Sequence, residues 1–249
     1  MPHSRLAVLI PAFNEEKTIR SVVDACLQFT SNVIVVDDGS TDNTVKEIQN
    51  LPIKILRNAQ NRGKDISLIR GFSYAKDLDI DAVITLDADT QHNPNDIPHF
   101  IQAMQQYPNR IIIGARIIDT KNAPRIRLFA NRAADFFISW AAGGRILDTQ
   151  SGFRLYPCNI LPTFISAASQ RGQFVFESKV LIDASRKGTT PASLAIASCY
   201  PDDARASYFR PIVDTSKIVA LIAWKITSRG LCLKGLYNTL FQPPTIYEN

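Results

Sequence analysis

The chain has 249 residues, 45% of them hydrophobic, which suffices for one substantial core and excludes a disordered or low-complexity protein. Its net charge of +5 favours anionic partners such as nucleotides, phosphates or an acidic membrane face, and is too small to indicate nucleic acid binding. The four cysteines lack the paired spacing of a zinc site or a disulfide framework. We expect a cytoplasmic protein, because no basic-then-apolar leader precedes the first strand-like segment.

The first half of the chain alternates between short apolar runs and helical patterns. Four β-branched runs predict strands buried on both faces, at residues 6–10, 33–36, 53–56 and 82–86. Helical spacing is found at residues 19–27, 45–48, 66–72 and 97–104. We expect Asn14, Glu15 and Glu16 to begin the first helix, and Asn93-Pro94 to cap the fourth. This alternation predicts an α/β protein with a mostly parallel sheet flanked by helices.

The second half continues less regularly. Residues 111–113 and 194–199 are predicted strands, and 125–140 and 174–187 are predicted helices, the first of them ended by Gly143-Gly144. We divide the chain into a catalytic domain over 1–200 and a tail over 201–249, made of a lid loop and basic amphipathic helices. The apolar stripe at 218–224 is shorter than the roughly 20 residues that span a bilayer. With its basic flanks it could lie on an anionic membrane, or pack on the domain with a solvated basic face.

Acidic side chains follow three of the predicted strands. Asp87 and Asp89 come directly after 82–86, Asp37 and Asp38 after 33–36, and Glu15 shortly after 6–10. One such strand end is typical of an ordinary turn or cap, but ligands of parallel sheets gather at the carboxyl ends of the strands. An Asp-x-Asp pair can hold a divalent cation that keeps positions for substrate phosphates, and Gln91 could add a neutral oxygen. The pattern predicts a metal-diphosphate site.

Six motifs in order resemble family 2 glycosyltransferases, in particular the dolichyl- or polyprenyl-phosphate sugar synthases. They are Pro11-Ala-Phe-Asn-Glu15, Asp37-Asp-Gly-Ser40, Asn61-Arg-Gly-Lys64, Asp87-Ala-Asp-Thr-Gln91, Gly114-Ala-Arg116 and Gln150-Ser-Gly-Phe-Arg154. The resemblance covers roughly residues 6–188. It implies a GT-A fold and inverting transfer of a sugar from a nucleotide-diphosphate donor.

The resemblance also implies roles for individual residues. The nucleotide sugar would be held by Pro11, Phe13, Glu15, Asp37, Asp38, Lys64 and Ala88. Mg2+ or Mn2+ would be ligated by Asp87, Asp89 and Gln91 beneath the diphosphate. Arg116 and Arg154 would face donor or acceptor phosphates and complete the catalytic set with the two aspartates. Such a set suits the reaction, because negative charge builds up on the departing nucleotide diphosphate.

The acceptor leaves two alternatives open. A lipid phosphate is already ionised near neutral pH, so it needs alignment and no general base. A hydroxyl acceptor would need a carboxylate, for which Glu177 is the candidate, although Glu177 could equally face solvent on its helix. Arg205 and Arg210 flank two aromatic residues in a segment that could be a lid on the donor or lipid head group, or a plain surface loop.

The sequence departs from the family at Asp65, where relatives commonly have glycine, so the donor base and sugar stay open. The Gln-x-x-Arg-Trp motif of processive polysaccharide synthases is lacking. Two other classes compete: a nucleotide-binding domain without turnover, and a haloacid-dehalogenase-type phosphohydrolase, in which Gln91 occupies the place of an expected threonine or valine. We predict a metal-dependent inverting glycosyltransferase, peripheral on the inner membrane face, with a lipid-linked acceptor, polyprenyl phosphate. The sequence does not determine the oligomeric state.

Overall fold

The structure is a computed structural model that describes residues 5–118, 125–161, 176–197, 222–224, 226–227 and 230–247. Its internal contacts divide it into two compact units. Unit 1 comprises Met1–Gln102, Gly152–Arg171 and Cys199–Arg205, and unit 2 comprises Ala103–Ser151, Gly172–Ser198 and Ala206–Asn249. The predicted boundary at residue 200 falls outside the described residues, so the division into catalytic domain and tail stays a prediction.

Unit 1 is built on a mostly parallel sheet. Its described strands are β1 (Leu6–Ala12), β2 (Asn32–Asp37), β3 (Lys54–Arg57), β4 (Ala82–Thr85) and β6 (Arg154–Pro157), in the order β3-β2-β1-β4-β6. The first four run parallel, and β6 runs antiparallel to β4. Ala12 pairs with Asp37, so the carboxyl ends of β1 and β2 lie side by side.

Burial follows the sequence pattern in the middle of this sheet and departs from it at the edges. Nearly all of β1 and β2 and all of β4 are buried, as their β-branched runs predict. The prediction is wrong for β3, which is an edge strand with exposed Lys54 and Arg57 at its ends. Strand β6 was not predicted, because Arg-Leu-Tyr-Pro contains no β-branched residue and its burial comes from pairing with β4.

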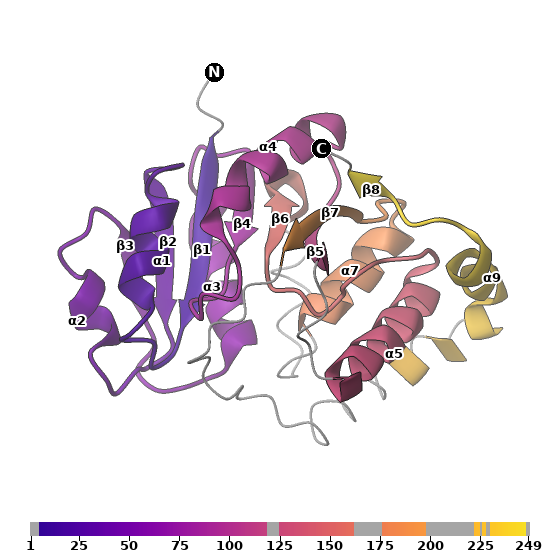
Figure 1. The fold of residues 1–249 in the computed structure, drawn as a ribbon, viewed down its shortest axis with the longest axis horizontal. Helices are drawn as coiled ribbons and strands as arrows, with labels where there is room; N and C mark the ends of the chain where they lie inside the picture. The colour runs from indigo at the N-terminus through magenta and orange to yellow at the C-terminus, as the bar shows by residue number, and fades with distance from the viewer. Residues whose placement is uncertain are drawn as a thin grey trace. The chain divides into compact units, whose positions relative to one another are not determined.

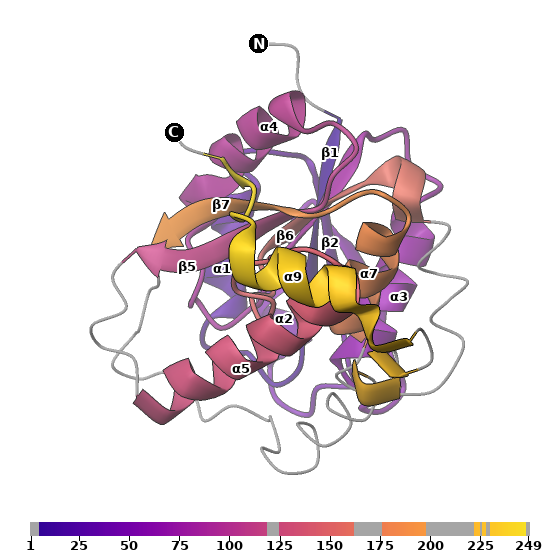
Figure 2. The ribbon, with the colours of Figure 1, turned by 90° about the vertical axis from the view of Figure 1, so that its right-hand side faces the viewer.

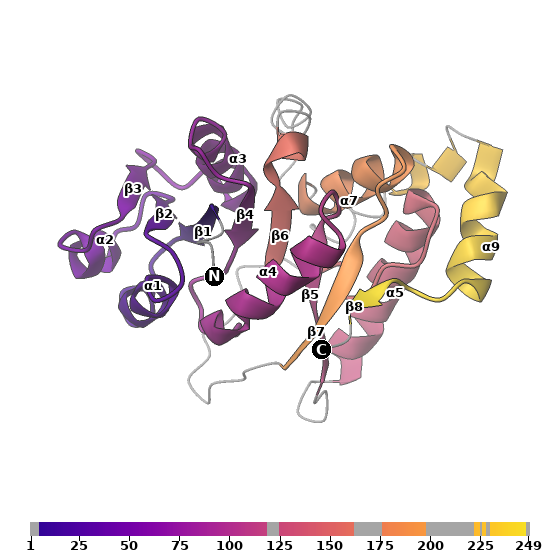
Figure 3. The same ribbon diagram turned by 90° about the horizontal axis from the view of Figure 1, so that it is seen from above.

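Helices cover both faces of the unit 1 sheet. They are α1 (Ile19–Cys26), α2 (Thr44–Ile48), α3 (Lys64–Ala75), the short η1 (Pro94–Asp96) and α4 (Ile97–Gln106), which crosses the unit boundary at residue 102. Helices α1 and α3 lie on opposite faces (Figure 3). Asn93 caps η1 as expected, with its side chain accepting from the Asn95 N–H. The predicted start of the first helix at Asn14–Glu16 is wrong, because the Asn14 and Glu16 side chains bond to the next loop and α1 begins at Ile19.

Unit 2 contains a second set of parallel strands. Its described strands are β5 (Ile112–Ile118), β7 (Ala192–Ala197) and β8 (Ile246–Tyr247), in the order β5-β7-β8. Its helices are α5 (Arg125–Ala142), α7 (Phe176–Arg186) and α9 (Leu233–Phe241), preceded by the short η3 (Gly230–Cys232). Both α7 and α9 pack against α5 (Figures 1 and 2). Gly143, with φ 93°, ends α5 as predicted. Within the described residues, no helix combines the length and apolar character needed to cross a membrane.

Asp135 ties α5 to the segment that follows it. Its carboxylate accepts hydrogen bonds from the Asp148 N–H at 3.2 Å, and from the N–H and hydroxyl of Thr149, each at 2.7 Å. Asp148 has φ 45°, a conformation that needs such support in a non-glycine residue. Burial outweighs these bonds, and the negative charge of Asp148 adds to it, so the pKa of Asp135 is raised from 3.8 to about 6.

The raised pKa of Asp135 predicts a pH-dependent stability. Protonated Asp135 contributes stability that is fully present below about pH 4 and is lost as the pH rises through about 6. A rise in pKa from 3.8 to about 6 corresponds to about 3 kcal/mol. We therefore expect the free energy of unfolding of the wild type, relative to Asp135→Asn, to fall by about 2 to 3 kcal/mol between about pH 4 and about pH 7.5.

Urea denaturation at the two pH values measures this difference. Asp77→Asn, at an exposed carboxylate on the turn after α3, controls for the loss of one acidic group. A difference between wild type and Asp135→Asn that stays constant over this range would show that folding leaves the ionisation of Asp135 unchanged.

Candidate active site

The loops after β1 and β2 are fastened to each other. The Asn14 N–H donates to the Ser40 hydroxyl at 2.8 Å, and the Thr41 N–H donates back to the Asn14 side chain at 2.8 Å. The Glu15 N–H donates to the Thr44 hydroxyl at 2.7 Å. Asn14 has φ 55°, a left-handed conformation that asparagine tolerates better than most residues. Three of the residues expected to hold the nucleotide are half-buried here: Pro11 near the end of β1, and Phe13 and Glu15 in the fixed loop.

Asp37 and Asp38, at the end of β2, are both buried and both accept hydrogen bonds from the protein. Asp37 accepts from the Ser40 N–H at 3.1 Å and from the Arg57 guanidinium at 3.0 Å, which joins β2 to the edge strand β3. Asp38 accepts from the Asn58 side chain at 2.7 Å. A nucleotide-binding role for this pair stays a prediction, to which the structure adds a role in organising the neighbouring loops.

Asp38 also fixes the backbone that leads into α3. The Gly63 N–H donates to Asp38 Oδ2 at 2.7 Å, and the Arg62 N–H donates to Asp38 Oδ1 at 3.0 Å. The next residue, Lys64, is the first of α3. The carboxylate at the end of β2 therefore determines where the Lys64 side chain starts.

Lys64 forms an ion pair with the first aspartate after β4. Its Nζ lies 2.6 Å from Asp87 Oδ1, and each side chain is 27% exposed, so the pair is only partly screened by water. Gly152 lies against both: a Cβ there would overlap Asp87 Oδ2 and stand 2.8 Å from Lys64 Nζ. The Gly152 carbonyl in turn accepts from the Thr85 hydroxyl at 2.8 Å. The glycine of the Gln-Ser-Gly-Phe-Arg motif thus leaves the room that this ion pair occupies, a role the sequence did not assign to it.

Asp89 lies on the same turn as Asp87. Its Oδ1 accepts a hydrogen bond from the Gln91 N–H at 3.1 Å. Gln91 itself is half-buried. Burial, followed by the negative charge of Asp87, raises the pKa of Asp89. Ala88, between the two aspartates, is buried. Two carboxylates held this close favour a nearby positive charge.

The donor set fits a magnesium-like cation. Among the described residues, no group of three or more His, Cys, Asp or Glu side chains could hold a metal by itself. Magnesium does not require three protein ligands of this kind, because it is commonly held by one or two carboxylates together with substrate phosphates and water. Asp87 and Asp89, with the Gln91 amide as a further oxygen, match this incomplete site better than a closed structural metal site.

Arg154 and Arg116 occupy different surroundings. Arg154, in unit 1, begins β6 opposite Thr85 and is 1% exposed, with Nη1 donating to the Tyr156 hydroxyl at 3.4 Å. Arg116, in unit 2, makes a two-pronged bond to Asp148: Nε to Oδ2 at 2.7 Å and Nη2 to Oδ1 at 2.8 Å. Its backbone N–H donates to the same carboxylate at 2.9 Å. The charge of Arg116 is therefore balanced by Asp148, a partner the sequence did not reveal.

The residues expected to serve the acceptor are only partly described. Glu177 is the second residue of α7 and is half-buried, with Oε1 shielded from water, so both its role as a base and its solvent-facing alternative stay predictions. Arg205, Arg210 and the predicted lid around them lie outside the described residues.

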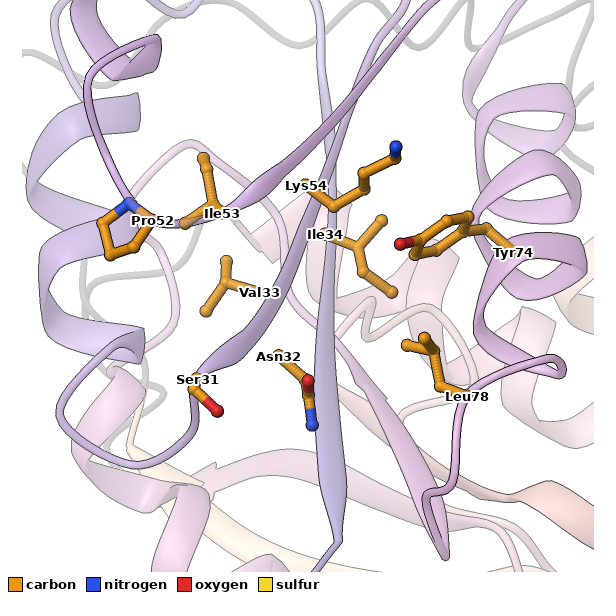
Figure 4. A pocket seen from close by; sticks show the side chains of 9 residues that line it. All are labelled: Ser31, Asn32, Val33, Ile34, Pro52, Ile53, Lys54, Tyr74 and Leu78. Carbon is orange, nitrogen blue, oxygen red and sulfur yellow. The ribbon is translucent and has the colours of Figure 1, made fainter.

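A cavity of about 300 Å³ lies elsewhere in unit 1, between β2, β3 and α3 (Figure 4). Its lining includes Asn32 and Lys54, the first residues of β2 and β3, together with Tyr74. It therefore opens at the amino ends of these strands. Ligands of parallel sheets bind at the carboxyl ends, where the aspartates lie, so we do not assign this cavity to the active site.

Comparison with known proteins identifies the family of the chain. Residues 7–165 match the model of the family described as Glycosyl transferase family 2. A UDP-N-acetylglucosamine–dolichyl-phosphate N-acetylglucosaminyltransferase of Methanococcus voltae is 29% identical over 223 residues, covering 81% of this chain and 88% of that protein. A dolichol-phosphate mannosyltransferase of Pyrococcus furiosus is 32% identical over 141 residues, covering 52% of this chain and 39% of the relative.

Solved structures share the fold. Glucosyl-3-phosphoglycerate synthase from Mycobacterium tuberculosis, in complex with Mn2+, UDP-glucose and phosphoglyceric acid, superimposes with a TM-score of 0.64 at 19% identity, covering 92% of this chain and 80% of that one. The same enzyme with Mg2+ and UDP gives a TM-score of 0.61 at 21% identity, covering 91% and 79%. This likeness confirms the GT-A fold. With its family model spanning more than half of its length, the chain belongs to glycosyltransferase family 2 and is a glycosyltransferase.

Proposed function

We propose that this glycosyltransferase moves a sugar, with inversion, from a nucleotide-diphosphate donor to a lipid phosphate, with a divalent cation at Asp87 and Asp89. The observation that carries the proposal is the partly buried pair of aspartates at the carboxyl end of β4. One of them, Asp87, forms an ion pair with Lys64, and Gly152 lies against both side chains. The loops after β1 and β2, which are hydrogen-bonded to each other, belong to the same unit, and Phe13 and Glu15 there would contact the nucleotide together with Pro11 of β1.

The cation would be Mg2+ or Mn2+, held by Asp87, Asp89 and Gln91, and it would stabilise the charge of the departing diphosphate. The remaining work falls to the chain's own residues. Lys64 carries a compact positive charge on the first turn of α3. Once the cation binds Asp87, the Lys64 ammonium could neutralise a donor phosphate instead. Arg116 and Arg154 stay candidates for further phosphate contacts.

A lipid phosphate is the acceptor we favour. Relatives carry names that specify dolichyl phosphate, and a further one, from Serratia proteamaculans, is named an undecaprenyl-phosphate 4-deoxy-4-formamido-L-arabinose transferase. An ionised phosphate oxygen is its own nucleophile, so the enzyme must align it and exclude water. A membrane-bound acceptor would place the enzyme on the inner membrane surface. The second candidate, a hydroxyl acceptor, is favoured only by the half-buried Glu177 carboxylate, which would take its proton.

Asp89→Ala should remove turnover without unfolding the protein. Loss of one cation ligand should lower kcat by about 10²–10³-fold or more, a magnitude typical of losing one preorganised electrostatic contact. The melting temperature should hold, because burial already disfavours the charge of Asp89. The assay measures transfer to polyprenyl phosphate with Mn2+ and the nucleotide sugar that raises the melting temperature most.

Asp77→Ala, at an exposed carboxylate, is the matched control and should keep wild-type turnover. Wild-type turnover in Asp89→Ala would contradict the role given to Asp89. Donor-independent release of phosphate from a phosphate ester would instead favour a phosphohydrolase, and donor binding without turnover would favour a binding domain.

Lys64→Met should strengthen the binding of Mn2+ in the absence of nucleotide. The Lys64 ammonium, 2.6 Å from Asp87 Oδ1, competes with a cation for that carboxylate. Removing a partly buried ion pair partner should lower the Kd for Mn2+ by about three- to tenfold, corresponding to about 0.7 to 1.4 kcal/mol. The loss of the paramagnetic signal of free Mn2+ on titration with protein reports this affinity directly.

Lys46→Met, at an exposed position of α2, controls for the change in net charge. An unchanged or weaker affinity in Lys64→Met would mean that the cation does not use the carboxylate bound by Lys64.

A further inference from the structure

Helix α9 turns its small and polar residues toward the protein. Gly235 and Thr239 are buried, and the Asn238 side chain donates to the Gly143 carbonyl at 2.9 Å. A Cβ on Gly235 would stand 2.6 Å from the Trp140 carbonyl oxygen and 3.0 Å from Gly143 Cα. The helix is therefore packed closely against the end of α5, through backbone and polar contacts (Figure 2).

The opposite side of the same segment is apolar and exposed. Its members, which we call the outward patch, are Leu231 (52% exposed), Leu233 (67%), Tyr237 (57%), Leu240 (53%) and Phe241 (67%). Leu233, Tyr237, Leu240 and Phe241 follow the i, i+4, i+7, i+8 spacing of one helical stripe. The Tyr237 and Phe241 rings lie 5.0 Å apart. Trp224, earlier in the same unit, is 69% exposed.

This arrangement is the reverse of a normal surface helix, whose apolar stripe faces the core. Burying a leucine or phenylalanine side chain contributes about 1.5 to 3 kcal/mol, and the exposed side chains of the outward patch lack most of that contribution. Contiguous exposed apolar patches on soluble proteins mark sites of protein or membrane interaction. The outward patch is therefore a candidate interaction surface.

We propose that the outward patch docks the enzyme on the surface of an anionic lipid bilayer. The sequence of residues 205–249 contains six basic residues against two acidic ones, Asp214 and Glu248, and one of the basic residues, Lys234, belongs to α9 itself. Anionic headgroups complement this charge, at about 1 kcal/mol per basic residue near the surface. Tyrosine, tryptophan and phenylalanine beside leucine suit the boundary between headgroups and acyl chains.

A second copy of the chain is a poorer occupant. A two-fold contact would set the patch of one copy, with Lys234 next to Leu233 in α9, against the same patch of the other, and so bring like charges together in a segment whose sequence is basic overall. The bilayer proposal rests on the lipid acceptor proposed above. Docking on the membrane that holds the acceptor would raise the acceptor's effective concentration at the active site.

Co-sedimentation with vesicles tests the surface directly. The wild type should bind vesicles of phosphatidylcholine with phosphatidylglycerol, and bind pure phosphatidylcholine more weakly. Leu240→Glu with Phe241→Glu should lower the partition coefficient at least about tenfold, because two inserted side chains are lost and two negative charges are added. Gln105→Glu with Gln106→Glu adds the same charges at adjacent exposed positions of α4 and should bind nearly as the wild type does.

Two acceptors separate docking from catalysis. With a short, water-soluble polyprenyl phosphate, Leu240→Glu with Phe241→Glu should turn over at the wild-type rate, and with a long-chain acceptor in vesicles it should lose at least about tenfold. Equal vesicle binding by wild type and variant would overturn the docking surface and leave the transferase proposal standing. Vesicle binding by the wild type that is lost in the variant, with no transfer by the wild type to either acceptor, would leave the docking surface standing and overturn the transferase proposal. A dimer that the variant converts to monomer, without vesicle binding by either, would also overturn the inference in favour of a second copy.

Discussion

The ion pair between Lys64 and Asp87 is the interaction on which the candidate active site depends. Asp87 and Asp89, separated by Ala88, are both partly buried, and there the repulsion between like charges is stronger than in water. Burial, followed by that repulsion, raises the pKa of Asp89. Lys64, 2.6 Å from Asp87, supplies the positive charge that keeps the pair compatible with folding. A divalent cation would offset the same repulsion more strongly, so the arrangement suits exchange between a resident ammonium and an arriving metal.

The position of Lys64 is set by residues far from it in sequence. Asp38 holds the backbone at Arg62 and Gly63 directly before α3, and the absence of a side chain at Gly152 leaves space for the ammonium and the carboxylate. These contacts join the ends of β2 and β4 and the start of β6 within one unit. A buried carboxylate that organises a loop thus determines the placement of a more exposed charge, which makes the site a product of the sheet topology and its buried hydrogen bonds.

The sequence predicted the features of the fold and the site that depend on neighbouring residues, and it did not predict those that depend on contacts between distant segments. Buried β-branched runs predicted β1, β2 and β4, and the Asn93-Pro94 cap and the Gly143 stop were confirmed because each acts through its own backbone. Strand β6 and the partners Asp148 and Asp135 were missed because they depend on pairings across the fold. The burial of β3 was wrong because a sequence run does not show which strand lies at an edge, and the start of α1 was wrong because Asn14 and Glu16 bond to residues 41–43.

Helix α9 shows that apolar periodicity does not by itself predict which face of a helix packs on the protein. Its sequence contains an apolar stripe, and such a stripe ordinarily predicts the face that packs on the core. What decides its orientation is tertiary: Gly235 allows the backbone of α9 to approach the Trp140 carbonyl, and Asn238 satisfies the Gly143 carbonyl at the end of α5. Those contacts pack the polar face of α9 against α5, so the apolar face is exposed to solvent. An apolar stripe is stabilised by a non-aqueous environment, and Leu233, Tyr237 and Phe241 of this stripe are each more than half exposed to water. The excess of basic residues in the surrounding sequence, with Lys234 on α9 itself, then favours an anionic bilayer over a second copy of the same surface, because the bilayer supplies the opposite charge.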